Sequence, residues 1–269
     1  MPVAQVKQRS SNQSRKPPSQ RETVGHQSAQ KLWGGKALKQ RQSLQRHLLN
    51  KVLSPLCNDS SPCNQLICPV CRFRAQKQCI GEMRNVLERP KGSKAPKRGK
   101  QCFITVIAKS GVFPEEPPTA DEFIQAREAY HRVLRRHAPK ASFLCCLDLS
   151  KNTDIQGEVS WVLHVHGLAL NFGKQHRVRV SQALRKAGSP SKKPLVAKKA
   201  NDPVSQLAYC AKAQFSQRQS YTDKKGRANT RNRPLSIEDE VQLALGLSRL
   251  KAPQRFFHIG RGHKKVDGT

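Results

Sequence analysis

Two histidines lie inside an otherwise apolar segment at residues 160–172, SWVLHVHGLALNF, and no other segment constrains the fold as strongly. Successive side chains of a β-strand alternate between its faces, so His164 and His166 are expected on the same face. Apolar residues occupy both alternating sets, which is typical of a strand covered on both faces. Buried imidazoles need polar partners, because unpartnered polar groups cost free energy in a core. The pair is therefore either hydrogen-bonded within the core, half exposed on an edge strand, or functional.

The segments that precede this strand predict an α+β fold. Residues 102–108, CFITVIA, and residues 143–149, FLCCLDL, are short apolar runs of the kind that form buried strands. Between them, Thr119 and Glu122 form a capping-box pattern, which begins a helix expected to reach about His137. Strand, helix, strand, turn and strand is the order of a compact α+β sheet.

A second helix is predicted to begin at Pro203, because Asp202 is a good N-cap and proline fits the first helical position. Tyr209 lies off the apolar arc of this helix, and Lys212 follows three residues later. Both side chains are therefore expected on one polar face. The plainer interpretation is a half-exposed tyrosine beside a solvated lysine.

The chain is strongly basic, with 50 Lys and Arg against 18 Asp and Glu and a net charge of +32. Such a charge repels itself unless a polyanion is the partner, and nucleic acid is the first candidate. A membrane is not expected as a partner, because the sequence contains no long apolar span. The first thirty residues show no apolar signal region, so we expect a cytoplasmic protein in a reducing compartment.

Four of the nine cysteines cluster within fifteen residues: Cys57, Cys63, Cys68 and Cys71. The two residues between Cys68 and Cys71 let both thiolates reach one tetrahedral ion, and the earlier pair could complete a zinc site. Four cysteine ligands leave no open position, so this zinc would be structural. The alternative is a set of free buried cysteines.

Composition divides the chain into five parts. Residues 1–36 are expected to form a disordered basic tail, because they contain almost no aliphatic side chains. We expect a helix plus the cysteine module at 37–88, a basic linker at 89–101, the main domain at 102–217, and a basic loop with a terminal helix and strand at 218–269. The basic residues nearest the cysteine module and in the linker are candidate DNA contacts: Arg72, Arg74, Lys97, Arg98 and Lys100.

Four motifs in this order resemble those of the HUH endonuclease class, which contains rolling-circle replication initiators of plasmids and phages and related transposases. The motifs are CPVCR at 68–72, FITVIA at 103–108, LHVHGLAL at 163–170 and AYCAK at 208–212. The resemblance covers about residues 57–217. It implies an HUH-like antiparallel sheet with helices packed on it, with residues 102–217 as the catalytic domain.

The resemblance also implies a reaction and assigns roles in it. His164 and His166 would bind a divalent ion, Mg²⁺ or Mn²⁺, and Tyr209 would attack the scissile phosphate. Lys212 would orient that phosphate or help the phenol to ionise. A histidine pair with a carboxylate suits such an ion, and a nearby cation would lower a phenol pKa from its usual value of about 10. No phosphate-binding GxxxxGK[ST] loop contradicts a reaction that needs no nucleotide.

The third metal ligand has two candidates in the sequence. Asp148 lies on the strand before the histidine strand, where related replication proteins often carry an acidic residue. Glu158 is the rival, six residues before His164 but in an expected turn.

The step that ends the reaction also has more than one candidate residue, because position 205 is serine where some initiators have glutamate. Either one tyrosine suffices, or Tyr221 or a second subunit completes the reaction.

The expected function is therefore initiation of rolling-circle replication, by nicking and rejoining one DNA strand through a phosphotyrosine. The partners would be single-stranded or cruciform origin DNA, with a host helicase as a further candidate; the sequence does not specify an oligomeric state. Two alternatives remain: an HUH-type transposase, and a non-catalytic basic zinc protein that binds nucleic acid. A ribosome-associated RNA-binding protein would fit the charge but leaves Tyr209 and the histidines without a role.

Overall fold

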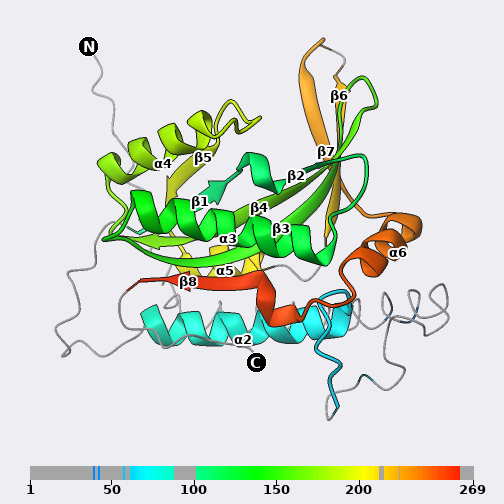
Figure 1. The fold of residues 1–269 in the computed structure, drawn as a ribbon, viewed down its shortest axis with the longest axis horizontal. Helices are drawn as coiled ribbons and strands as arrows, with labels where there is room; N and C mark the ends of the chain where they lie inside the picture. Colours follow the sequence, from blue (N-terminus) through cyan, green and yellow to red (C-terminus); the bar gives the residue numbers. More distant parts are fainter. Residues whose placement is uncertain are drawn as a thin grey trace, which may run out of the picture.

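A computed structural model of the chain describes residues 39, 42, 57, 61–87, 101–211, 215–223 and 225–260. Within these residues, eight strands form one sheet, with the main order β5-β1-β4-β3-β6-β7 (Figure 1). Strand β2 pairs with β4, and β8 pairs with β3. The strands are β1 Cys102–Val106, β2 Val112–Pro114, β3 Ser142–Thr153, β4 Val159–Leu170, β5 Leu195–Lys199, β6 Ser216–Thr222, β7 Ala228–Pro234 and β8 Phe256–Ile259.

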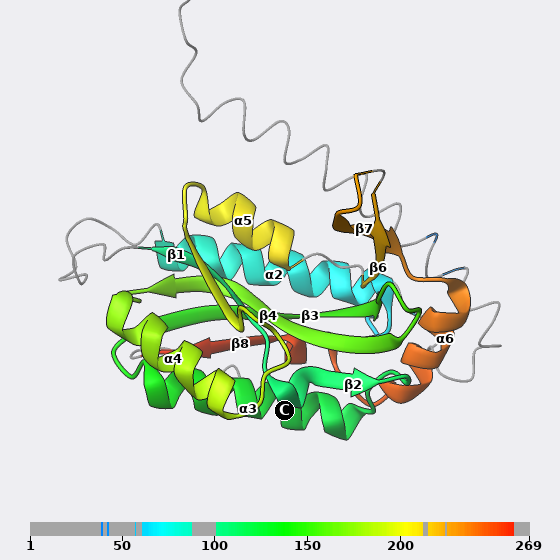
Figure 2. The ribbon, with the colours of Figure 1, turned by 90° about the horizontal axis from the view of Figure 1, so that it is seen from above.

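Helices cover both faces of this sheet, which makes the fold α+β as expected. The helices are α2 Pro69–Leu87, α3 Ala120–His137, α4 Lys174–Lys186, α5 Pro203–Cys210 and α6 Ile237–Gly246. Figure 2 shows α3 and α4 on one side of β3 and β4, and α2 and α5 on the other. The two long central strands are therefore enclosed between two helical layers.

Alternation along β4 decides which side chains face each layer. Leu163 and Val165 join the main core together with Phe123 and Tyr130 of α3. On the opposite face, Leu168 packs with Leu144 of β3 and with Cys79 of α2. His164 and His166 have the parity of Leu168, so they face the layer that contains α2 and α5.

The predicted antiparallel sheet is wrong in one pairing, because β6 runs parallel to β3. Strand β6 follows β3 only after β4, α4, β5 and α5, so no hairpin turn forces these two neighbours to be antiparallel. The pairings of β4 with β1, β2 and β3 are antiparallel. The sheet is therefore mixed, with an antiparallel centre around the histidine strand.

Strands from beyond residue 217 belong to the same sheet as the main domain. Strand β8 pairs with residues 143–146 of β3, and β6 pairs with residues 150–153. Between them the buried Arg255 donates from Nε to the carbonyl oxygen of Leu147 at 3.1 Å. The expected extension at 218–269 thus completes one edge of the sheet in its described part.

Several local predictions are confirmed at the helix ends. Thr119 Oγ1 accepts from Glu122 N while Glu122 Oε2 accepts from Thr119 N, so the capping box of α3 is formed. Ser236 Oγ accepts from Asp239 N at the start of α6, the terminal helix expected after residue 217. The expected tail at 1–36, most of the expected helix before the cysteine module, and the expected linker at 89–101 except residue 101 lie outside the described residues.

Tyr130 ties α3 to the sheet and gives a first testable prediction. Its hydroxyl donates to the carbonyl oxygen of Leu163 and accepts from Ala108 N at 3.0 Å, and the residue is fully buried. Tyr130→Phe keeps the ring but removes the hydrogen bonds to both buried backbone groups. We expect the free energy of unfolding in urea to fall by about 2 kcal/mol. Tyr209→Phe, the same change at an exposed residue, should leave stability unchanged; equal effects of both changes would contradict the assigned bonds.

Candidate functional site

The two histidines lie side by side at the centre of the sheet. Their ring centroids are 5.8 Å apart and the ring planes differ by 20°. His164 is 2% exposed, whereas His166 is half-buried. Strand β4 holds them there because it pairs along its length with β3 on one side and with β1 on the other.

Asp148 joins the histidines through the register of β3 and β4. It lies directly opposite His164, so the two side chains leave the sheet on the same face. Its Oδ2 lies 3.8 Å from Nε2 of His166. Glu158, the rival third ligand, is exposed in the turn before β4. The geometry therefore favours Asp148.

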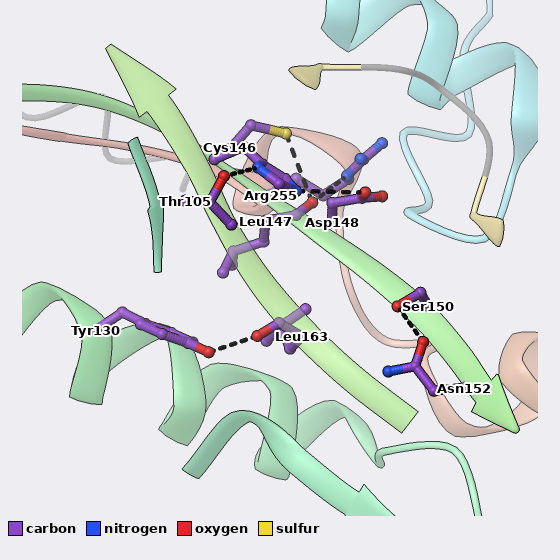
Figure 3. Close-up of polar contacts among 10 residues, drawn as sticks. Thr105, Tyr130, Cys146, Leu147, Asp148, Ser150, Asn152, Leu163 and Arg255 are labelled. Carbon is purple, nitrogen blue, oxygen red and sulfur yellow. Dashed lines mark hydrogen bonds and ion pairs between the residues drawn. The ribbon is translucent and has the colours of Figure 1, made fainter. Parts of the chain in front are cut away.

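Thr105 of β1 is a neighbour of this group that the sequence analysis did not identify. It is paired with His166 in the sheet, and its Oγ1 lies 3.0 Å from Nδ1 of His166 (Figure 3). If the Nδ1 proton is donated to Thr105, the lone pair of Nε2 faces the Asp148 carboxylate. A cation could then replace the missing proton between them. Thr105 would act as the outer partner that orients a histidine ligand.

The charge state of His164 also suits metal binding. Burial, followed by the positive charge of Arg218 on β6, lowers the pKa of His164 to about 4. The imidazole is therefore neutral near pH 7, which is the form that binds metal ions. Its Nδ1 is buried and has no hydrogen-bond partner among the described residues.

The three donors are spaced more widely than those of a closed metal site. In the described part of the chain, the four cysteines are the only group of three or more such donors that all lie within 4.8 Å of one another. Asp148, His164 and His166 are thus assembled on one face without being contracted around a common point. A divalent ion would have to draw the three donors together. Two imidazoles and one carboxylate are suitable ligands for such an ion.

Tyr209 lies on α5, the helix that packs against β4 on the histidine face. Asp202 accepts from Ser205 N at 3.1 Å, which confirms the predicted cap, and Gln76 of α2 donates to the carbonyl oxygen of Ala208. Ala208 and Cys210 are buried, while the Tyr209 side chain is 68% exposed. The phenol is therefore accessible to a macromolecular substrate. Lys212 lies outside the described residues.

The four clustered cysteines form a group that could hold a structural metal such as zinc. Their Sγ atoms are 3.4 Å apart for Cys57 and Cys71, 3.6 Å for Cys63 and Cys71, and 3.7 Å for Cys57 and Cys68. Four thiolates about 2.3 Å from a tetrahedral zinc would be about 3.8 Å apart. The backbone N of Cys63 also donates to Cys57 Sγ, a contact that would support a metal-binding thiolate from outside the ligand shell.

The pKa values of these cysteine thiols also favour a bound metal ion. The hydrogen bond to Cys68 raises the pKa of Cys63 to about 11, and bonds to Cys63 and Cys68 raise the pKa of Cys71 further. Without an ion the crowded thiols hold their protons, since adjacent thiolates would repel one another. A bound divalent cation removes that penalty and releases the protons.

The predicted DNA contacts near the cysteine module require a correction. Arg72 is only 4% exposed, and its guanidinium lies 4.6 Å from the centre of the Phe215 ring. Arg255 lies 5.1 Å from the same ring, and burial lowers the pKa of Arg72 to about 10. Arg72 follows Cys68 by one helical turn, so it faces the core and is not available to DNA. Arg74 is half-buried.

The remaining predicted contacts, Lys97, Arg98 and Lys100, lie outside the described residues. Tyr221 is on β6, opposite Asn229 of β7, and therefore not on the helix of Tyr209. No helix in the described ranges is long and apolar enough to cross a membrane. Comparison with protein-family models, with curated proteins and with solved structures gives no match for this chain.

Proposed function

We propose that the protein is a metal-dependent, tyrosine-using DNA nicking and rejoining enzyme that initiates rolling-circle replication. One observation carries this proposal: Asp148, His164 and His166 share the sheet face that is covered by the helix bearing Tyr209. The net charge of +32 supports a nucleic-acid substrate.

The proposed reaction exchanges one phosphodiester for another. The Tyr209 oxygen bonds to the scissile phosphorus as the bond from phosphorus to one sugar oxygen breaks. The phenol proton passes to solvent, and the departing sugar oxygen takes up a proton to become a hydroxyl. Because no water attacks, the phosphotyrosine can later be returned to a DNA hydroxyl by the reverse exchange.

Asp148, His164 and His166 would hold the ion, with Thr105 fixing the tautomer of His166. A divalent ion bound there would polarise the scissile phosphate as a Lewis acid. Arg218 adds a fixed positive charge close enough to lower the pKa of His164, and its Nε is buried without a hydrogen-bond partner among the described residues. That guanidinium is suited to a phosphate oxygen.

A second candidate is a non-catalytic, zinc-containing nucleic-acid-binding protein. The burial of His164 and the cysteine cluster favour it, since a core histidine and a structural metal need no catalytic role. One experiment separates the two candidates. The full chain is incubated with Mn²⁺ and a random-sequence single-stranded oligonucleotide pool labelled at both ends, followed by denaturing electrophoresis. An enzyme gives a labelled protein band, whereas a binder gives none.

His166→Ala is expected to lower Mn²⁺-dependent adduct formation by roughly a hundredfold or more, because the ion loses a ligand and supplies several kcal/mol to the transition state. Thr105→Val should weaken the apparent Mn²⁺ affinity by about 10- to 100-fold, with the rate restored at high Mn²⁺. The measurement is the adduct yield against Mn²⁺ concentration.

Glu158→Gln is the control for these changes, since that carboxylate is exposed in a turn, and it should titrate like the parent protein. Adduct formation by His166→Ala at the parental rate in EDTA would remove the metal from the proposal.

A further inference from the structure

Strands β6 and β7 form an antiparallel pair, which we call the ribbon; residues 216–219 of β6 also pair with β3, so its outer part, residues 220–222 and 228–230, is two-stranded. It rises from the end of the sheet that lies near α6 (Figure 1). All seven residues of β7 are exposed. A two-stranded ribbon without an apolar face gains little stability of its own. Its exposed side chains are therefore available to a partner outside the protein.

The register divides the ribbon into two faces of different chemistry. Residues directly opposite each other share a face, and successive pairs alternate. One face, here named the reading face, contains the pairs Gln217 with Arg233, Gln219 with Arg231, and Tyr221 with Asn229. The other face contains the pairs Ser216 with Pro234, Arg218 with Asn232, Ser220 with Thr230, and Thr222 with Ala228.

The second face lies on the histidine side of the sheet, because Ser216 and Arg218 are paired with Ser150 and Asn152, which have the parity of Asp148. Arg218 on this face influences the pKa of His164. The reading face lies on the other side of the sheet, with Gln217 and Gln219 beside Lys151 and Thr153, and its members Gln219, Tyr221, Asn229, Arg231 and Arg233 are exposed.

The reading face carries the side-chain types that recognise base edges. One arginine side chain can donate two hydrogen bonds to guanine, at O6 and N7. One glutamine or asparagine side chain can likewise form two hydrogen bonds with adenine, at N6 and N7. No carboxylate lies on this face. Asp223 is in the turn, where its Oδ1 accepts from Lys225 N and Arg227 N. Arg231 lies over the Tyr221 ring at 5.6 Å, which limits the freedom of its guanidinium.

We propose that the reading face of the ribbon enters the major groove of duplex DNA and recognises base sequence there. The major groove of B-form DNA is wide enough to admit a two-stranded β-ribbon. Duplex RNA is a poorer fit, because its major groove is deep and narrow. This inference goes beyond the nicking activity, since duplex recognition requires neither Tyr209 nor a metal. The ribbon would place recognised duplex on one face while Arg218 remains beside His164 on the other.

The test is selection of a random 30-base-pair duplex pool on the full chain. The parent protein is expected to enrich a common sequence. Arg231→Ala with Arg233→Ala should lower the preference for that sequence over a scrambled duplex by roughly 10- to 100-fold. Arg231→Lys with Arg233→Lys should keep binding to both duplexes but lose most of the preference, because lysine cannot form the paired bonds of arginine.

Arg135→Ala with Arg136→Ala is the matched control, since it removes the same charge from exposed positions of α3, outside the ribbon. This control should keep the enriched sequence and the preference. Three results would overturn the inference: no enriched sequence, an unchanged preference in the alanine pair, or full preference in the lysine pair. The last would mean that the ribbon contacts phosphates only. Adduct formation on single strands is unaffected in each case, so failure here is distinct from failure of the proposed nicking activity.

Discussion

Tyr209→Phe is expected to abolish the covalent adduct with single-stranded DNA completely, because phenylalanine has no oxygen to bond to phosphorus. The change should leave salt-dependent DNA binding intact, since the ring remains and the side chain is 68% exposed on α5. The adduct is measured by denaturing electrophoresis, and binding is measured by fluorescence anisotropy of the same oligonucleotides at several salt concentrations.

Tyr221→Phe is the matched change at the other exposed tyrosine and also tests the open question of the terminating step. An adduct should form in this variant. If Tyr221 supplies the second exchange, the adduct accumulates and the rejoined product is lost. If one tyrosine suffices, both yields match the parent protein. An adduct in Tyr209→Phe would assign the nucleophile to another residue and would contradict the proposed function in its present form.

Cys71→Ser is expected to eliminate one equivalent of bound zinc and to lower the free energy of unfolding by more than about 4 kcal/mol. Cys71 is close to both Cys57 and Cys63, and it lies in the first turn of α2. That helix covers the histidine face, and the adjoining Leu66 bonds through its N to the carbonyl oxygen of Leu250. Loss of the metal should therefore loosen both the helix and the C-terminal edge.

Zinc content is measured by elemental analysis, and stability by urea unfolding with and without a chelator. Cys79→Ser is the matched control, because Cys79 is a buried cysteine of the same helix outside the cluster. It should retain zinc and lose about 1 kcal/mol. A parent protein that contains no zinc, or a Cys71→Ser variant with parental zinc content, would show that the four cysteines are only a thiol group.

Local patterns predicted several parts of the site correctly. The two-residue spacing of His164 and His166 determined that they share a face, because alternation is a property of any strand. The caps at Thr119, Asp202 and Ser236 are also local, since each side chain bonds to a backbone group three residues away. Such interactions depend on short stretches of chain and can be inferred without knowledge of the fold.

Other features depend on segments far apart in the sequence. Thr105 contacts His166 only because β1 pairs with β4, and Arg218 approaches His164 only because β6 adds to β3. The sequence predicts an exposed basic residue at Arg72, but on helix α2 its guanidinium packs against the Phe215 ring in the core. No short pattern contains the information about these pairings.

The amino-acid sequence by itself determined the basic charge, the α+β class, the cysteine group and the shared face of the histidines, because these follow from composition, alternation and spacing. Only the tertiary structure decided that Asp148 lies beside His166, that β6 runs parallel to β3, and that the ribbon separates its arginines into two faces. The physical reason is register: the relative shift of two strands sets every cross-strand neighbour, and long-range packing selects that shift.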